Sequence, residues 1–199
     1  MFDFQQGEIL LINKPMEWTS FQVVKKIRYE IRRKLGIKKI KVGHAGTLDP
    51  LATGLLILCT GKKTKTIDQI QKQKKEYTGR IQLGSTTPSF DLETETDQRF
   101  SVDHLNEEVI KDATSRLTGK IEQVPPSFSA KKVGGQRAYN AARKGELLVL
   151  PPNNVEVYEF EINCNELPAV DFRITCSKGT YIRALARDLG KETNSGGHL

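Results

Sequence analysis

A single acidic residue, Asp49, stands in the glycine-rich stretch V-G-H-A-G-T-L-D-P-L-A-T-G, which runs from Val42 to Gly54. Pro50 restricts Asp49 to extended backbone conformations. The glycines on either side permit sharp turns or the close approach of another chain. Such a loop can hold one carboxylate at a fixed angle over a cleft. The alternative is a purely structural Asx turn, which is the common use of an Asp-Pro pair.

A second candidate group follows the turn S-K-G, where T-Y-I-R places Tyr181 and Arg183 in the first turn of a predicted helix. A positive side chain in a first turn opposes the helix dipole. An arginine at this position is therefore best explained by an anionic partner. The alternative is an exposed arginine with no partner.

Two further side chains can contribute to such a site. Tyr77 lies in an alternating strand beside Lys74 and Lys75, and an aromatic ring flanked by cations suits base stacking above a phosphate backbone. A tyrosine that only fills the core is the alternative. His44, five residues before Asp49, can be a general base, a stacking group or a packed core residue.

The elements that position these groups mix strands and helices without a regular βαβ order, so the sequence indicates an α+β fold. Alternating or short apolar runs predict the strands, and apolar residues at helical spacing predict the helices. Strands are predicted at 8–13, 55–59, 74–83, 155–162 and 170–176, and helices at 19–35, 103–117 and 180–189. The polar stretch 84–98 is predicted to be a loop or an irregular hairpin. After the last helix the sequence given ends with G-G-H-L, and no closing element is predicted after these residues.

The composition is that of an ordinary globular protein of 199 residues with a net charge of +7. This excess of Lys and Arg favours a polyanionic partner such as nucleic acid, although a merely basic protein is an equal alternative. Three widely spaced cysteines, Cys59, Cys164 and Cys176, indicate neither a zinc site nor a disulfide framework, and they suit the reducing cytoplasm. No metal cluster, nucleotide-cofactor motif, signal peptide or membrane span is predicted.

Five segments then resemble, in order, those of the TruB family of tRNA pseudouridine synthases. They are I-N-K-P with W-T-S, G-H-A-G-T-L-D-P-L-A-T-G-L-L, K-E-Y-T-G-R-I-Q-L-G, V-P-P-S-F-S-A-K-K and C-S-K-G-T-Y-I-R-A-L-A-R-D-L-G. The resemblance spans Leu10 to Leu199. It implies a pseudouridine synthase fold, with a mixed, largely antiparallel sheet flanked by helices and a central catalytic cleft.

The resemblance also implies an activity. Residues 1–199 would form one catalytic domain that converts uridine 55 in the T-loop of tRNA to pseudouridine. The base must leave the RNA stack, because its reacting atoms are inaccessible within it. The resemblance implies a cytoplasmic monomer that needs no cofactor, metal or protein partner.

Three residues match catalytic positions of the family. Asp49 would act on the ribose, either as a nucleophile at C1′ or as a base at the 2′ position. Tyr77 would stack on the target base and assist the loss of the C5 proton. Arg183 would pair with Asp49, keep it ionised in a dry pocket and orient it.

Four more residues match substrate-binding or supporting positions of the family. His44 would lie near displaced RNA bases, Tyr181 would line the pocket, and Leu199 would pack beside the base. Lys14, with Pro15, would support the Asp49 loop.

The sequence departs from the family pattern in two places. The usual threonine-aspartate pair after the tyrosine strand is replaced by S-T-T-P-S-F-D, which displaces Asp91. The chain stops where the family continues into a further strand and an RNA-binding PUA domain, so we expect a truncated catalytic domain with weaker tRNA binding. These features leave an alternative function, an RNA-binding or tRNA-folding module with weak or lost catalysis, which rests on the basic helix 19–35.

Overall fold

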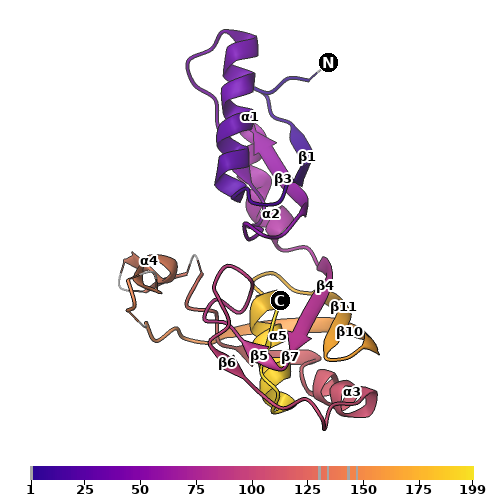
Figure 1. The fold of residues 1–199 in the computed structure, drawn as a ribbon. Helices are drawn as coiled ribbons and strands as arrows, with labels where there is room; N and C mark the ends of the chain where they lie inside the picture. Colours follow the sequence, from indigo (N-terminus) through magenta and orange to yellow (C-terminus); the bar gives the residue numbers. More distant parts are fainter. Residues whose placement is uncertain (1, 130, 134, 143, 147) are drawn as a thin grey trace. The chain divides into compact units, whose positions relative to one another are not determined.

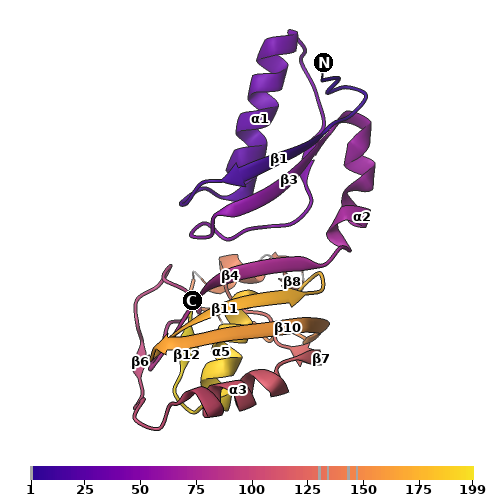
Figure 2. The ribbon, with the colours of Figure 1, turned by 90° about the vertical axis from the view of Figure 1, so that its right-hand side faces the viewer.

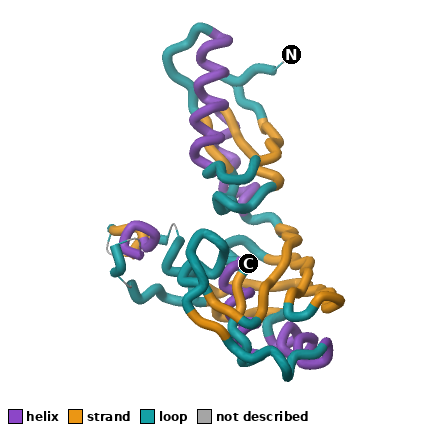
Figure 3. The backbone as a smooth tube through the Cα atoms, in the orientation of Figure 1, coloured by secondary structure: helices purple, strands orange, loops and turns teal. Residues whose placement is uncertain are grey.

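The computed structural model describes residues 2–129, 131–133, 135–142, 144–146 and 148–199. The chain divides into two compact units, residues 1–73 and 74–199, and each is described by itself. Figure 1 labels their elements along the chain, and Figure 3 distinguishes the strands and helices from the connecting loops.

The first unit is a small antiparallel sheet with a long helix on one face. Its elements are β1 (Ile9–Lys14), α1 (Ser20–Leu35), β2 (Val42–His44), β3 (Gly54–Thr60), the 3-10 helix η1 (Gly61–Thr66) and α2 (Ile67–Gln71). The strand order is β1-β3-β2. The apolar side of α1 packs on β2 and β3, which buries Val24 and Ile31 against Leu56 and Leu58. The opposite face of the sheet leaves Leu11 and Leu55 exposed.

The first helix begins and ends where its sequence predicts. Thr19 caps its N-terminus, since the Thr19 hydroxyl accepts a hydrogen bond from the Gln22 backbone N–H, and the Gln22 side chain accepts one from the Thr19 N–H. This reciprocal pair is a capping box. Gly36 ends the helix with φ 63°, a left-handed conformation that glycine adopts without strain.

The second unit is a five-stranded antiparallel sheet in the order β12-β4-β11-β10-β7. Its strands are β4 (Lys75–Leu83), β7 (Gly119–Gln123), β10 (Asn153–Glu166), β11 (Ala169–Cys176) and β12 (Gly197–His198). The helices α3 (Glu107–Arg116) and α5 (Ile182–Glu192) cover one face of this sheet (Figure 2). The core between them contains Ile81, Ile110, Val157, Ile174 and Leu185.

The other face of this sheet is polar. Arg80 pairs with Asp171 and Glu166, with N–O distances of 2.7 and 2.8 Å, and Arg173 pairs with Glu76 at 2.8 Å. The sheet is thus buried on one face only, as its alternating strands predict. Shorter elements complete the unit: β5 (Ser85–Thr86) with β6 (Gln98–Arg99), β8 (Lys132–Val133) with β9 (Gln136–Arg137), and α4 (Ala138–Ala142).

The structure corrects two sequence-based predictions. The helix predicted at 103–117 begins only at Glu107, because Asn106 accepts the capping hydrogen bond from the Val109 N–H. The last helix begins at Ile182, and Thr180 does not cap it, because the Thr180 hydroxyl donates to the Ser177 carbonyl. The structure also adds a strand that was not predicted, since β12 pairs with β4 through Gly197 and Leu83.

Candidate active site

The Asp49 loop connects β2 to β3, and the Lys14 side chain is hydrogen-bonded to its backbone at Pro50. The Lys14 side chain is completely buried, and its Nζ donates to the carbonyls of Pro15 (2.9 Å), Trp18 (2.6 Å) and Pro50 (3.1 Å). Burial lowers the pKa of Lys14, and the nearby charge of Asp49 opposes this shift. Lys14, the last residue of β1, therefore links the Pro50 end of the Asp49 loop to the backbone of Pro15 and Trp18.

Further hydrogen bonds fix the loop on both sides of Asp49. The Leu48 N–H donates to the Ser20 hydroxyl (3.0 Å), which donates to the Leu48 carbonyl (3.1 Å). The Ala52 N–H donates to the Asp49 carbonyl at 3.1 Å. Gly46 has φ 136°, a value that side chains rarely tolerate, which accounts for a glycine at this turn. The carboxylate is thus carried on a backbone that is anchored to the start of α1.

His44 lies at the end of β2, on the approach to this loop. It is partly buried, and its Nδ1 lies 2.5 Å from the Gly46 carbonyl oxygen. This contact fixes the ring at the base of the loop that carries Asp49. His44 and Lys14 therefore both contact the backbone of the loop that carries Asp49, within the first unit.

Arg183 lies in the first turn of α5 and is only 5% exposed. Its Nη1 donates to the Ser89 carbonyl and its Nη2 to the Phe128 carbonyl, both at 2.8 Å. Its Nε lies 3.4 Å from Oδ2 of Asp91, which is also buried. The prediction of an anionic partner for this arginine is confirmed by Asp91, and the alternative of an exposed, unpaired arginine is wrong.

Asp91 is itself held in place by its own loop. Its Oδ1 accepts hydrogen bonds from the Ser89 hydroxyl (2.5 Å) and the Glu93 N–H (2.9 Å). Its other carboxylate oxygen is thereby directed toward Arg183. Sequence reasoning noticed that Asp91 was displaced from the family position but gave it no role, because its partner lies 92 residues further along the chain, at position 183.

The start of α5 depends on Gln123, a residue that sequence reasoning missed. Gln123 ends β7 and is fully buried. Its Oε1 accepts from the Tyr181 N–H (2.8 Å) and its Nε2 donates to the Tyr181 carbonyl (3.2 Å). These two bonds fix the backbone of Tyr181, the residue that precedes the first turn of α5. No local signal identifies Gln123, since the contact is formed only in the folded sheet.

Tyr77 and Leu199 lie along the helix-covered face of the sheet. Both pack against the core of the second unit, and the Leu199 N–H donates to the Phe90 carbonyl at 3.0 Å. Lys74, which lies near Tyr77 in the sequence, places its Nζ 3.9 Å from the centre of the Tyr158 ring. Tyr77 is partly exposed, so it combines core packing with an accessible edge.

The predicted site residues thus fall into two groups. Lys14, His44 and Asp49 are assembled around one loop of the first unit, and Tyr77, Tyr181, Arg183 and Leu199 belong to the second unit. The predicted pairing of Asp49 with Arg183 joins the two units and stays a prediction.

Neither a metal site nor a membrane-spanning helix is found among the described residues. Within them, no three His, Cys, Asp or Glu side chains gather in a group that could hold a metal ion. In the same part of the chain, no helix has the length and apolar character needed to cross a membrane. The three cysteines are free thiols, and burial raises the pKa of each.

Comparison with known proteins gives the family. The model of the N-terminal domain of TruB family pseudouridylate synthases matches residues 32–182. The tRNA pseudouridine synthase B of Phocaeicola vulgatus is 58% identical over 99% of this chain and 84% of its own length. That of Flavobacterium johnsoniae is 54% identical over 99% of this chain and 86% of its own. That of Chlorobaculum tepidum is 46% identical over 98% and 81%.

Solved structures show the same fold. A chain from the crystal structure of a Cbf5–Nop10–Gar1 complex superposes with a TM-score of 0.68 at 27% identity. The match covers 98% of this chain and 46% of that one, so this chain spans about half its length. A chain from an H/ACA ribonucleoprotein bound to a substrate RNA matches with a TM-score of 0.64 at 25% identity. The α+β architecture is therefore that of the pseudouridine synthases, as the sequence predicts.

Proposed function

This chain belongs to the TruB family of pseudouridylate synthases, and on that premise we propose that it isomerises uridine 55 in the T-loop of tRNA to pseudouridine. The observation that carries the proposal is the 58% identity to a tRNA pseudouridine synthase B over 99% of the chain. The net charge of +7 supports an RNA substrate, because phosphates recruit Lys and Arg. The reaction breaks the bond from N1 to C1′, turns the base and joins C5 to C1′, and the C5 proton that is released is balanced by a proton taken up at N1.

Asp49 is the proposed catalytic residue that acts on the ribose of the everted nucleotide. The anchored loop supports this role, because Lys14 and Ser20 leave its backbone little freedom. A carboxylate held in advance at one angle spares the reaction the entropic cost of ordering it. One carboxylate can act as a nucleophile at C1′ or as a base at the 2′ position, and neither step requires a metal.

Arg183 is the proposed counter-charge of Asp49, and Tyr77 the proposed stacking partner of the target base. The buried setting of Arg183 supports its part, since two carbonyls and the Asp91 carboxylate fix the plane of its guanidinium. Tyr181 and Leu199 are proposed to line the same base pocket, and His44 to contact the RNA bases that the everted nucleotide leaves behind. No protein partner is proposed for the reaction.

Release of tritium from C5-labelled uridine in a T-loop RNA tests this function directly. We expect the unsubstituted protein to release the label and Asp49→Asn to release none, while RNA affinity stays roughly unchanged. Asp68→Asn, an exposed carboxylate on α2, is the matched control and should behave as the unsubstituted protein does. Normal turnover by Asp49→Asn would exclude the assignment of Asp49, and RNA binding without any release would favour an RNA-binding module instead.

A further inference from the structure

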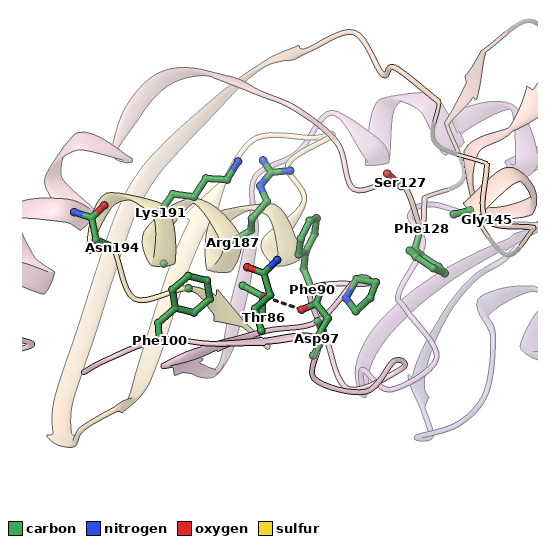
Figure 4. Close-up of a pocket in the computed structure, with 16 residues that line it drawn as sticks. Thr86, Phe90, Asp97, Phe100, Ser127, Phe128, Gly145, Arg187, Lys191 and Asn194 are labelled. Carbon is green, nitrogen blue, oxygen red and sulfur yellow. Dashed lines mark hydrogen bonds between the residues drawn. The ribbon is translucent and has the colours of Figure 1, made fainter. Parts of the chain in front are cut away.

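A pocket of about 690 Å³ lies wholly within the second unit, beside the C-terminal half of α5 (Figure 4). Its volume falls in the range of ordinary small-ligand sites. Neither Arg183 nor Tyr77 lines it, so it is separate from the proposed base pocket. Its walls come from the segment around β5 and β6, from residues 127–128, 142 and 145, and from α5 with the turn that follows.

One wall presents a fixed aromatic ring. Phe100 is 40% exposed, and one part of its ring packs directly on Gly196. A Cβ at Gly196 would lie 2.6 Å from two ring carbons of Phe100. A residue larger than glycine at position 196 would therefore displace the ring. The uncovered part of the ring faces the pocket, which makes Phe100 a rigid stacking surface for a planar group.

Two cationic side chains, Arg187 and Lys191, line the adjacent wall of the pocket. Arg187 is 9% exposed, and its guanidinium carbon lies 5.2 Å from the centre of the Phe90 ring. Asp188 holds it with two bonds, from Nε (2.7 Å) and Nη2 (3.0 Å). Lys191, one turn further along α5, extends toward the same side of the pocket as Arg187 (Figure 4). Arg187 is therefore held at one end of the cavity, and the exposed Lys191 lies on the same side.

The rest of the lining combines apolar side chains, among them Pro88 and Phe128, with polar groups that include a carboxylate. Asp97 accepts a hydrogen bond from the Thr86 hydroxyl at 2.6 Å, and Gln98 and Asn194 add two amides. A bare inorganic anion would be repelled by Asp97, and a wholly apolar ligand would leave the polar groups without partners. The lining instead matches a molecule with a planar ring, hydrogen-bonding edges and one anionic group.

We propose that this pocket binds one nucleotide of the RNA substrate other than the isomerised uridine. Its base stacks on Phe100, and its phosphate lies near Lys191 and Arg187. Sites for single-stranded nucleic acid combine aromatic rings with cations in this way. The inference rests on the proposed function for the identity of the RNA.

The same loop connects this pocket to the proposed catalytic residues. Phe90 has φ 60°, a left-handed conformation that is unfavourable for an aromatic residue and indicates that its surroundings hold it there. Its neighbour Ser89 accepts from Arg183, and its own carbonyl accepts from Leu199. A nucleotide in the pocket would thus contact Phe90, which belongs to the same loop as Ser89, whose carbonyl accepts a hydrogen bond from Arg183.

The test measures the affinity of the protein for an unmodified T-arm RNA over a range of salt concentrations, together with turnover at saturating RNA. We expect Phe100→Leu to raise Kd roughly ten-fold, because it removes the stacking surface but keeps an apolar side chain. Phe100→Trp should retain affinity. Lys191→Ala should weaken binding and lower the salt slope by about one. Lys111→Ala, the loss of one exposed charge on α3, is the matched control and should change Kd by less than about two-fold.

A crosslink locates the nucleotide. A photoreactive p-benzoylphenylalanine in place of Gln98 should crosslink to a single nucleotide of the T-arm other than the target uridine, and one in place of the exposed Glu108 should not. The proposal is overturned if Phe100→Leu and Lys191→Ala bind RNA as tightly as the unsubstituted protein. It is overturned equally if the crosslink maps to the target uridine. Pseudouridine formation by the unsubstituted protein, measured in the same samples, tests the proposed function independently of these outcomes.

Discussion

The carboxylate of Asp91 lies 3.4 Å from the Nε of Arg183, and both side chains are buried within the second unit. The Ser89 hydroxyl and the Glu93 N–H hold the other oxygen of that carboxylate. A charge pair fixed from both sides positions the guanidinium as well as neutralising it. We infer that Asp91 positions the Arg183 side chain.

Replacing Asp91 tests this positioning role. We expect Asp91→Ala to lower kcat by about 100-fold, because a displaced guanidinium no longer orients the reacting groups. KM for the RNA should change little, since Asp91 is buried. Steady-state kinetics of tritium release give both constants. Asp103→Ala, which removes an exposed carboxylate, is the control, and equal losses in both variants would contradict the role.

Gln123 should be needed to aim the first turn of α5. In Gln123→Leu the Tyr181 N–H loses its acceptor, while the Tyr181 carbonyl keeps the bonds from the Ala184 and Leu185 N–H groups, and we expect a cost of about 1 kcal/mol in the free energy of unfolding. The loss of kcat should exceed the loss of RNA affinity, because Arg183 is two residues further along. Chemical denaturation and single-turnover kinetics check the two effects. A variant with the stability and kcat of the unsubstituted protein would show that the helix start is fixed by other contacts.

Lys14 should stabilise the loop that carries Asp49. Lys14→Met keeps the apolar stem but removes the donor to three backbone carbonyls, of which Pro50 retains the Glu17 N–H. We expect a loss of about 1–3 kcal/mol in the free energy of unfolding. Trp18, the only tryptophan, lies in the same unit, and its fluorescence during denaturation follows the transition. The exposed Lys65→Met provides the comparison, and an equal effect there would exclude a special role for Lys14.

The same lysine predicts a pH dependence. Burial lowers the pKa of Lys14 below its ordinary value of 10.5, so between the lowered pKa and about 10.5 the unfolded chain binds more protons at this site. Stability relative to Lys14→Met should therefore rise as the pH increases through that window. Asp49→Asn removes a charge that raises this pKa, and the window should extend to lower pH. Denaturation midpoints between pH 7 and 10 test the sign, and a difference that falls with pH would contradict it.

Elements with local signals were predictable from sequence. The apolar spacing of 19–35, its capping pair Thr19 and Gln22 and the stop at Gly36 all lie within one stretch, and α1 follows them. The alternating residues of 74–83 likewise predicted β4. In both cases the residues that decide the structure are neighbours in the chain.

Contacts between distant segments were not predictable in this way. Thr180 has the chemistry of a helix cap, yet the helix starts after Tyr181 because Gln123, 58 residues earlier, binds the Tyr181 backbone. Asp91 showed no role in sequence because its partner is Arg183. The two residues of β12 carry too little pattern to predict a strand, and β4 supplies their pairing.

Incubating the purified protein with unmodified tRNA and mapping pseudouridine at single-nucleotide resolution tests the central proposal most directly. The expected result is one new pseudouridine, at position 55 of the T-loop, formed by the unsubstituted protein and absent with Asp49→Asn. No pseudouridine with the unsubstituted protein, or the same pseudouridine with Asp49→Asn, would contradict it.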